Sequence, residues 1–438
     1  MYAEIVRHRI GSLLERDRFA LLLSLMIQIP LAFFLGHFYD IRISMGTGYL
    51  VAGGLNPYEQ HYLGGIFNHE IFQGITQGFG YPPPWAIILG LIYLLSYKIV
   101  HDLFLYNFAI KLPIIAGNIF LAYAVRNMLL HDLKIDRIKA RRAWLLMLYN
   151  PFILITTSAW GQIDGIVAFL VILSFHYLHL KMTGRSAVLL ALAISLKPIA
   201  LPLLPLPIIY TARGSMKSCA KYLIISLVSI LVLTVVPFYL LNWNPATVLR
   251  NWDYHETVAG GLSIFGFVEA LQGTYHIPDS MYLLGFVWIP AVALGYMFLH
   301  PRFNSPEEMT RSACSIILIF LLTRAWVSEP NLVLLIPFLV MVMTLNNISR
   351  QVYIFAWSVP LVFAFLNTSI PQLFALIYPQ VIGDLSGIDL KIRGARLMAG
   401  YLTVLVWQVT GWYIVIRLNR HLSRSRFNRQ LISHSMPP

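Results

Sequence analysis

An acidic residue stands where the first long apolar run of the chain ends. Asp40 follows residues 19–38 almost directly, so its side chain is expected at the boundary between water and lipid. A carboxylate at that boundary can accept a proton from a substrate hydroxyl. Alternatively, Asp40 is an ordinary solvated loop residue or an ion-pair partner of Arg42. Asp40 is therefore a candidate base with a structural alternative.

Three basic residues lie beside or inside apolar segments and can bind an anionic group. Lys197 is the strongest, because a lysine at the centre of a spanning helix costs about 2.5–3.5 kcal/mol on insertion scales. Pro198 follows it, which predicts that residues 186–210 form two half-helices meeting at Lys197. Alternatively, the Lys197 side chain extends from its half-helix to the outer membrane surface and has no role in binding. Arg42 and Arg324 complete the set, although Arg324 can also be an interfacial anchor.

Further polar residues fall in segments expected on the same side of the membrane. The candidates for contacts with a substrate are Tyr81, Gln162, Asp164, His255, Glu256 and Glu329. Structural explanations compete with these roles, such as a helix cap for Asp164 and simple exposure for His255. His61 and His69 have no further ligands at suitable spacing, so no zinc site is predicted.

The composition places the chain in a membrane. Of its 438 residues, 58% are hydrophobic and only 12% are charged, whereas soluble domains carry about 25% charged residues. A soluble chain could not bury that much apolar surface in one core. The net charge of +13 does not indicate nucleic acid, because the basic residues stand in short segments between apolar runs.

The apolar segments predict an all-α polytopic fold. The segments that approach the roughly 20 residues required by a bilayer are 19–38, 103–125, 143–159, 164–180, 221–241, 281–299, 312–326, 331–345, 351–368 and 396–416. Residues 85–98 are too short to span at about 1.5 Å per residue and are expected in the outer interface. Together these segments predict about 10–12 transmembrane helices, with interfacial helices in the first outer loop.

The basic residues set the expected orientation. Most of the Lys and Arg become cytoplasmic if 85–98 stays in the interface and 186–210 returns to the inside. Both termini are then cytoplasmic, including the basic tail 417–438. The long loops expected on the outer face are 39–102, 242–280 and 369–395. No internal repeat divides the chain, so residues 1–438 are expected to form a single transmembrane domain.

The order of these features resembles polyprenol-dependent mannosyltransferases of the GT-C fold. An acidic residue after the first helix is followed by Gly54-Leu55-Asn56-Pro57-Tyr58 and by Tyr81-Pro82-Pro83. The downstream markers are Asn150-Pro151, Gly161-Gln162-Ile163-Asp164, Ser195-Leu196-Lys197-Pro198 with Pro205, and Ser328-Glu329-Pro330-Asn331 with Pro337. The chain is thus similar to GT87-type enzymes and to the catalytic subunit of GPI mannosyltransferase I.

The resemblance implies a glycosyltransferase that moves a sugar, with mannose favoured, from a polyprenyl-phosphate carrier. The acceptor would be a lipid-linked or glycan molecule at the outer or luminal face. Asp40 would be the general base, and Lys197, Arg42 and Arg324 would bind the donor phosphate. The outer loop with His255 and Glu256 would close over the donor sugar, and Glu329 would help to bind the acceptor. A single displacement would invert the anomeric centre, because a phosphate leaving group needs no general acid.

One departure from the family pattern bears on metal use. Many relatives carry Asp-x-Asp, whereas this chain has Asp40-Ile41-Arg42 and lacks the second carboxylate. Divalent Mg²⁺ and Mn²⁺ prefer oxygen ligands, so a reaction without a cofactor is expected and a divalent metal is the less favoured alternative. Other expected partners are membrane lipids but no nucleic acid. The plasma membrane is the expected location, or the endoplasmic reticulum in a eukaryote.

Three other functions compete with this hypothesis. A transporter or flippase of lipid-linked sugars would use the broken helix at Lys197 as its site, but the chain shows no repeated halves. A membrane acyltransferase would need a histidine base inside a span beside a second catalytic residue. A non-catalytic scaffold subunit would tolerate the loss of Asp40, which a transferase would not. The sequence indicates no oligomeric state.

Overall fold

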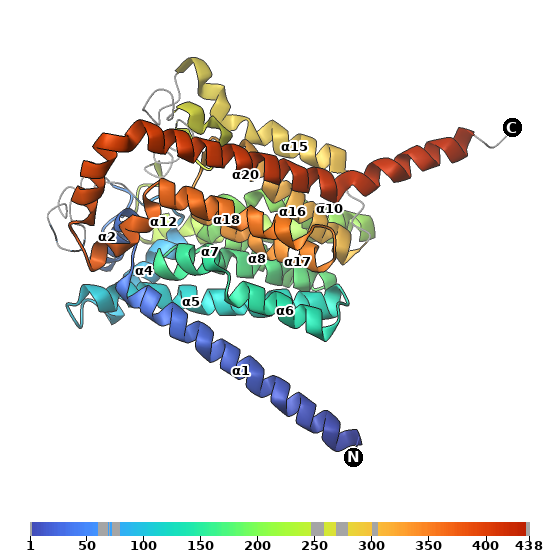
Figure 1. Ribbon diagram of the computed structural model, residues 1–438, viewed down its shortest axis with the longest axis horizontal. Helices are drawn as coiled ribbons and strands as arrows, with labels where there is room; N and C mark the ends of the chain where they lie inside the picture. Colours follow the sequence, from blue (N-terminus) through green and yellow to red (C-terminus); the bar gives the residue numbers. More distant parts are fainter. Residues whose placement is uncertain are drawn as a thin grey trace.

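The computed structural model describes residues 2–59, 69, 71, 79–246, 258–268, 279–299 and 305–434. Within these ranges the chain is almost entirely helical, which confirms the predicted all-α fold (Figure 1). Most helices lie roughly alongside one another in a bundle, and α1 departs from it obliquely. The β-structure described is one short parallel pair, β1 (Gly260–Gly261) with β2 (Trp326–Val327).

The helix boundaries follow the apolar segments and prolines of the sequence. The first half contains α1 (Tyr2–Phe34), α2 (Phe38–Ala52), α4 (Pro83–Leu95), α5 (Leu103–Asn127), η1 (Met128–Asp132), α6 (Arg137–Leu148), α7 (Pro151–Ile153), η2 (Leu154–Ala159), α8 (Asp164–His179), α9 (Thr183–Leu196), η3 (Pro198–Leu203) and α10 (Pro205–Gly214). The second half contains α11 (Met216–Thr234), α12 (Val236–Leu240), η4 (Ile264–Gly266), η5 (Asp279–Phe286), α15 (Trp288–Leu299), α16 (Pro306–Thr323), η6 (Glu329–Leu334), α17 (Ile336–Thr344), α18 (Arg350–Leu366), α19 (Ser369–Gln372), η7 (Leu373–Leu376) and α20 (Val381–His434).

Several of the described helices are long and apolar enough to cross a membrane. Four pass by length and composition, and they lie in α1, in α5 with η1, in α11 with α12, and in α20. Two bent helix pairs raise this number to six if each pair is one span. Shorter apolar helices accompany them at Pro83–Leu95, Thr183–Leu196, Leu283–Phe298 and Glu329–Thr344. The protein is therefore multi-pass, while the full number of spans stays a prediction.

The helical hairpin of α8 and α9 brings together residues that are far apart in sequence. A connection of three residues, 180–182, reverses the chain, and the two helices pack along each other. The start of α8 and the end of α9 therefore lie at the same end of the bundle. As predicted, the helix breaks at Lys197, whose backbone is extended with φ −152° and ψ 118°. The break places Lys197 opposite Asp164.

A sharp turn precedes α8. The segment Arg137–Ala159 and the helix Asp164–His179 meet at an angle of 120°. Gly161 makes this turn with φ +103°, a conformation that residues with a Cβ rarely adopt. The turn points Trp160 and Gln162 toward the start of α2, which lies in the first predicted outer loop.

Candidate active site

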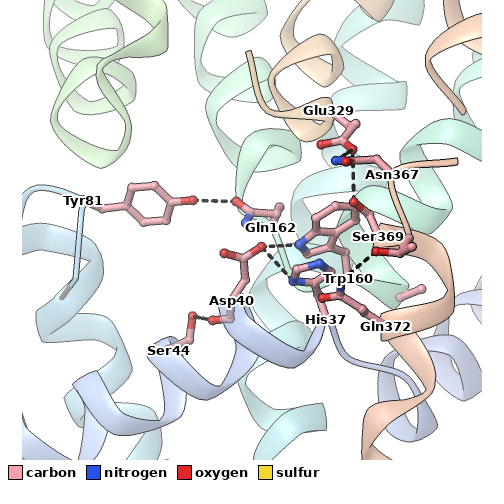
Figure 2. Close-up of polar contacts among 12 residues, drawn as sticks. His37, Asp40, Ser44, Tyr81, Trp160, Gln162, Glu329, Asn367, Ser369 and Gln372 are labelled. Carbon is pink, nitrogen blue, oxygen red and sulfur yellow. Dashed lines mark hydrogen bonds and ion pairs between the residues drawn. The ribbon is translucent and has the colours of Figure 1, made fainter. Parts of the chain in front are cut away.

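Asp40 lies in the first turn of α2 and contacts two aromatic residues. Its Oδ2 atom accepts a hydrogen bond from the indole Nε1 of Trp160 and lies 3.2 Å from Nδ1 of His37 (Figure 2). The His37 ring stacks on Trp160, with centroids 4.1 Å apart and an interplanar angle of 9°. The backbone N–H of His37 also donates to the Trp160 carbonyl, at 3.3 Å. Asp40 is thus held on one side, while 36% of its side chain is exposed.

These contacts keep the Asp40 carboxylate ionised. Burial alone raises its pKa, but the hydrogen bond and charge of His37, with hydrogen bonds from Trp160 and Gln162, outweigh burial and lower the pKa to about 2. Because the folded pKa lies below the ordinary value, ionised Asp40 favours the folded state above about pH 4. That stabilisation is lost as the pH falls toward 2. At neutral pH the residue is available as a proton acceptor.

We expect the His37→Gln variant to shift the acid limb of the pH profile to higher pH. Burial raises the Asp40 pKa and the contacts with His37 lower it. Without His37, the Asp40 pKa therefore rises and the residue protonates at a higher pH. The measurement is kcat/KM for sugar transfer against pH, compared with wild type. Substitution of His101, an exposed histidine before α5, is the control and should leave the limb in place. An unchanged limb in the His37 variant would show that His37 does not set the Asp40 charge.

Gln162 connects Asp40 to the predicted cation. Its Oε1 atom accepts hydrogen bonds from the Tyr81 hydroxyl, at 2.6 Å, and from Nζ of Lys197, at 3.3 Å. A hydrogen bond from Gln162 also reaches Asp40. Lys197 Nζ lies 5.1 Å from the centroid of the Tyr81 ring. The structure therefore gathers four predicted site residues, Asp40, Tyr81, Gln162 and Lys197, in one cluster.

Lys197 is not an isolated cation, because Asp164 pairs with it. Nζ of Lys197 donates to Oδ2 of Asp164 at 2.7 Å, and both side chains are buried. Asp164 stands in the first turn of α8, where the helix dipole favours a negative charge. Its second oxygen, Oδ1, is buried and has no hydrogen-bond partner among the residues that the structure describes. Asp164 is therefore the buried ion-pair partner of Lys197.

Glu329 lies next to the same cluster at the start of η6. Its buried carboxylate accepts hydrogen bonds from Nδ2 of Asn367, at 3.2 Å, and from Oγ of Ser369, at 3.1 Å. Figure 2 shows these residues beside Trp160, close to the Asp40 contacts. Glu329 is thus a second carboxylate near the site, held by the turn between α18 and α19.

Other predicted residues lie elsewhere or outside the described ranges. Arg42 is buried, and its Nη1 donates to the Ile71 carbonyl at 3.4 Å. Because α2 is helical, residues two apart point in different directions, so Arg42 does not share the face of Asp40. Arg324 ends α16 and packs over the Phe320 ring. The predictions for His255 and Glu256 fall outside the residues that the structure describes.

Two residues at the centre of the site did not emerge from the sequence. His37 is the extended residue that precedes α2, three residues before Asp40, and its ring lies 3.2 Å from the Asp40 carboxylate. Trp160 directly precedes the Gly161-Gln162 turn, and its residue type alone does not indicate a contact with Asp40. The described residues contain no group of three His, Cys, Asp or Glu side chains positioned to hold a metal ion. Independence from metal stays a prediction.

Comparisons with known proteins identify the family and the fold of the chain. A family model, glycosyltransferase family 87, matches residues 79–330, more than half of the chain. No curated protein matches the chain. The fold is similar to the crystal structure of ArnT from Cupriavidus metallidurans in the apo state, at 14% identity and a TM-score of 0.51, covering 93% of this chain and 77% of that one. The likeness confirms the GT-C fold. The chain is a multi-pass membrane glycosyltransferase, and it belongs to glycosyltransferase family 87.

Proposed function

We propose that the protein transfers a sugar, with mannose favoured, from a polyprenyl-phosphate carrier to a lipid-linked or glycan acceptor. The observation that carries the proposal is the arrangement around Gln162. On one side stands an ionised, partly exposed carboxylate, Asp40, and on the other stands the ammonium group of Lys197. A transfer from a phosphate carrier requires a base for the acceptor and a cation for the leaving phosphate.

The reaction would be a single displacement. The acceptor hydroxyl oxygen attacks the anomeric carbon, and its proton passes to Asp40. The bond between that carbon and the phosphate oxygen breaks, and its electron pair leaves with the polyprenyl phosphate. Attack from the face opposite the phosphate inverts the anomeric configuration, through a transition state like the one in glycoside hydrolysis. One carboxylate suffices for this scheme.

Lys197 would stabilise the leaving phosphate. The N–H donors of Lys197 reach Asp164, Gln162 and the Tyr81 hydroxyl, so a phosphate oxygen would take the place of one of the latter two contacts. Negative charge grows on the phosphate as the bond breaks, and a fixed cation then binds the transition state more strongly than the substrate. Tyr81 supports this environment because burial raises the pKa of its hydroxyl to about 12, which keeps it a neutral hydrogen-bond donor.

The proposal includes the site's placement in the cell. The cluster would face the outer or luminal side of the plasma membrane, or of the endoplasmic reticulum in a eukaryote, with both termini cytoplasmic. The basic loops support this orientation, since positive residues favour the cytoplasmic side. In Figure 1 the two ends of the chain project toward the same end of the bundle.

A reconstituted assay tests the proposal. The purified full chain in lipid nanodiscs is expected to transfer label from radioactive polyprenyl-phosphate mannose to membrane glycolipid acceptors, with inverted configuration in the product. GDP-mannose is the control donor and should give no product, because it lacks the lipid carrier. Neither binding nor transfer with the polyprenyl donor would end the proposal. Movement of the donor across proteoliposomes without product would favour a flippase.

A further inference from the structure

A lysine without any exposed surface lies inside the span formed by α5. The side chain of Lys111 is 0% exposed, and no described carboxylate lies within ion-pair distance of it. A buried lysine inside a span is costly, so its presence calls for a function. Its Nζ atom donates hydrogen bonds to two backbone carbonyls, those of Leu35 and of Ala159, the latter at 2.7 Å.

Both carbonyls stand at the ends of helical segments. Leu35 directly follows α1, and Ala159 is the last residue of η2. The last carbonyls of a helix have no partner within it, and they carry the negative end of the helix dipole. The Lys111 amine, placed between two such ends, donates a hydrogen bond to a carbonyl of each. This explains how Lys111 is accommodated without a carboxylate.

The neighbouring turn of α5 reinforces the same contact. Nδ2 of Asn107 lies one helical turn before Lys111 and donates toward the carbonyls of Ala32, at 2.7 Å, and Leu35, at 2.9 Å. Asn107 and Lys111 are thus spaced i and i+4 on one face of α5 and bind the same end of α1. The end of α1 is fixed by two side chains rather than one.

The two segments joined by Lys111 carry the site. Leu35 lies two residues before His37, and Ala159 directly precedes Trp160. A carbon added at Gly161 would lie 3.1 Å from Cε of Lys111, so the lysine stem fills the space beneath the turn. The Lys111 side chain therefore links the chain that presents Asp40 to the chain that presents Trp160.

We propose that Lys111 is a positioning residue, a buried clamp that holds the Asp40 segment (residues 35–41) in register with the Trp160 segment (residues 159–164). Its effect on sugar transfer rests on the proposed function, whereas its effect on the two segments does not. Without the clamp, the His37, Trp160 and Asp40 contacts lose their common geometry while the donor-binding Lys197 stays in place.

The test compares Lys111→Met with Lys98→Met, the same change at an exposed lysine beyond α4. Both full-length variants are studied in nanodiscs by hydrogen exchange with mass spectrometry and by transfer kinetics. In Lys111→Met, exchange at 35–41 and 159–164 should rise roughly tenfold or more, with little change in helix α15, which packs on α16. Misplaced catalytic groups should lower kcat by about 10²-fold, with KM for the donor nearly unchanged. The acid limb should also move to higher pH.

The readouts separate the two proposals. If the wild type transfers no sugar, the proposed function fails, and the exchange pattern alone decides on the clamp. Unchanged exchange in both segments, an equal rise along the whole chain, or an unchanged kcat in an active enzyme would each overturn the clamp. Should Lys111→Met not fold, Lys111→Gln keeps a shorter donor and should show an intermediate rise confined to the same segments.

Discussion

Replacing Asp40 with asparagine is expected to lower kcat by about 10²–10⁴-fold, the range typical for loss of a general base. Asparagine has nearly the same shape and can still accept the hydrogen bond from Trp160, so the surrounding stack should persist. It cannot take a proton from the acceptor hydroxyl. Donor affinity should change little, because the phosphate contact is assigned to Lys197. Single-turnover transfer and equilibrium binding of labelled donor measure the two effects separately.

Two further variants test whether the loss of activity is specific to the Asp40 carboxylate. Glu307→Gln removes an exposed carboxylate at the start of α16 and should leave transfer unchanged. Glu329→Gln removes the second carboxylate near the site, and its amide can still accept from Asn367 or Ser369. If Asp40→Asn keeps wild-type kcat and Glu329→Gln loses it, the base is Glu329 and the assignment of Asp40 is wrong.

The sequence was enough to predict that Asp40 and Lys197 lie close together. Apolar length placed Asp40 at the end of the first span, and proline placed Lys197 at a helix break. The basic loops then predict that both lie on the same side of the membrane. Each step rests on local composition, which is why it could be made without knowledge of packing.

Partners within the site were harder to predict, because they depend on packing between segments. Asp164 and Lys197 were both expected at the outer ends of helices, but their pairing requires α8 and α9 to run back along each other. Arg42 was expected in the first outer loop, 39–102, as a possible partner of Asp40 or of the donor phosphate. The helix α2 gives its side chain a different direction and a backbone partner.

The buried lysine shows a different limit. Lys111 is a charged residue inside the apolar segment 103–125, where a carboxylate or a lipid phosphate would be the usual partner. The partners are backbone carbonyls, which every residue carries and which therefore leave no mark in the sequence. His37 was overlooked for a related reason, since stacking on Trp160 joins segments more than a hundred residues apart. Such contacts depend on which helix ends pack against each other, and only the folded structure shows this.

Variants of Lys197 and Asp164 should distinguish the contribution of this ion pair to stability from the role of Lys197 in transfer. Lys197→Met leaves a fully buried carboxylate without its counter-ion, and loss of one partner of a buried pair typically costs about 3–5 kcal/mol. Asp164→Leu should destabilise for the converse reason, because it leaves Lys197 buried without its counter-ion. The double variant Lys197→Met with Asp164→Leu removes both charges, and replacement of a buried pair by apolar groups is often neutral. Its unfolding midpoint should therefore return toward that of wild type.

Function should not return with stability in that double variant. Donor binding and kcat should stay low, because the ammonium group for the leaving phosphate is absent even though the fold is restored. Thermal unfolding in nanodiscs, combined as a double-mutant cycle, gives the coupling between the two residues. Lys139→Met, which breaks an exposed pair with Asp136, is the matched control and should change little. If the double variant binds donor like wild type, Lys197 is a structural partner of Asp164, and the phosphate must be bound by another cation.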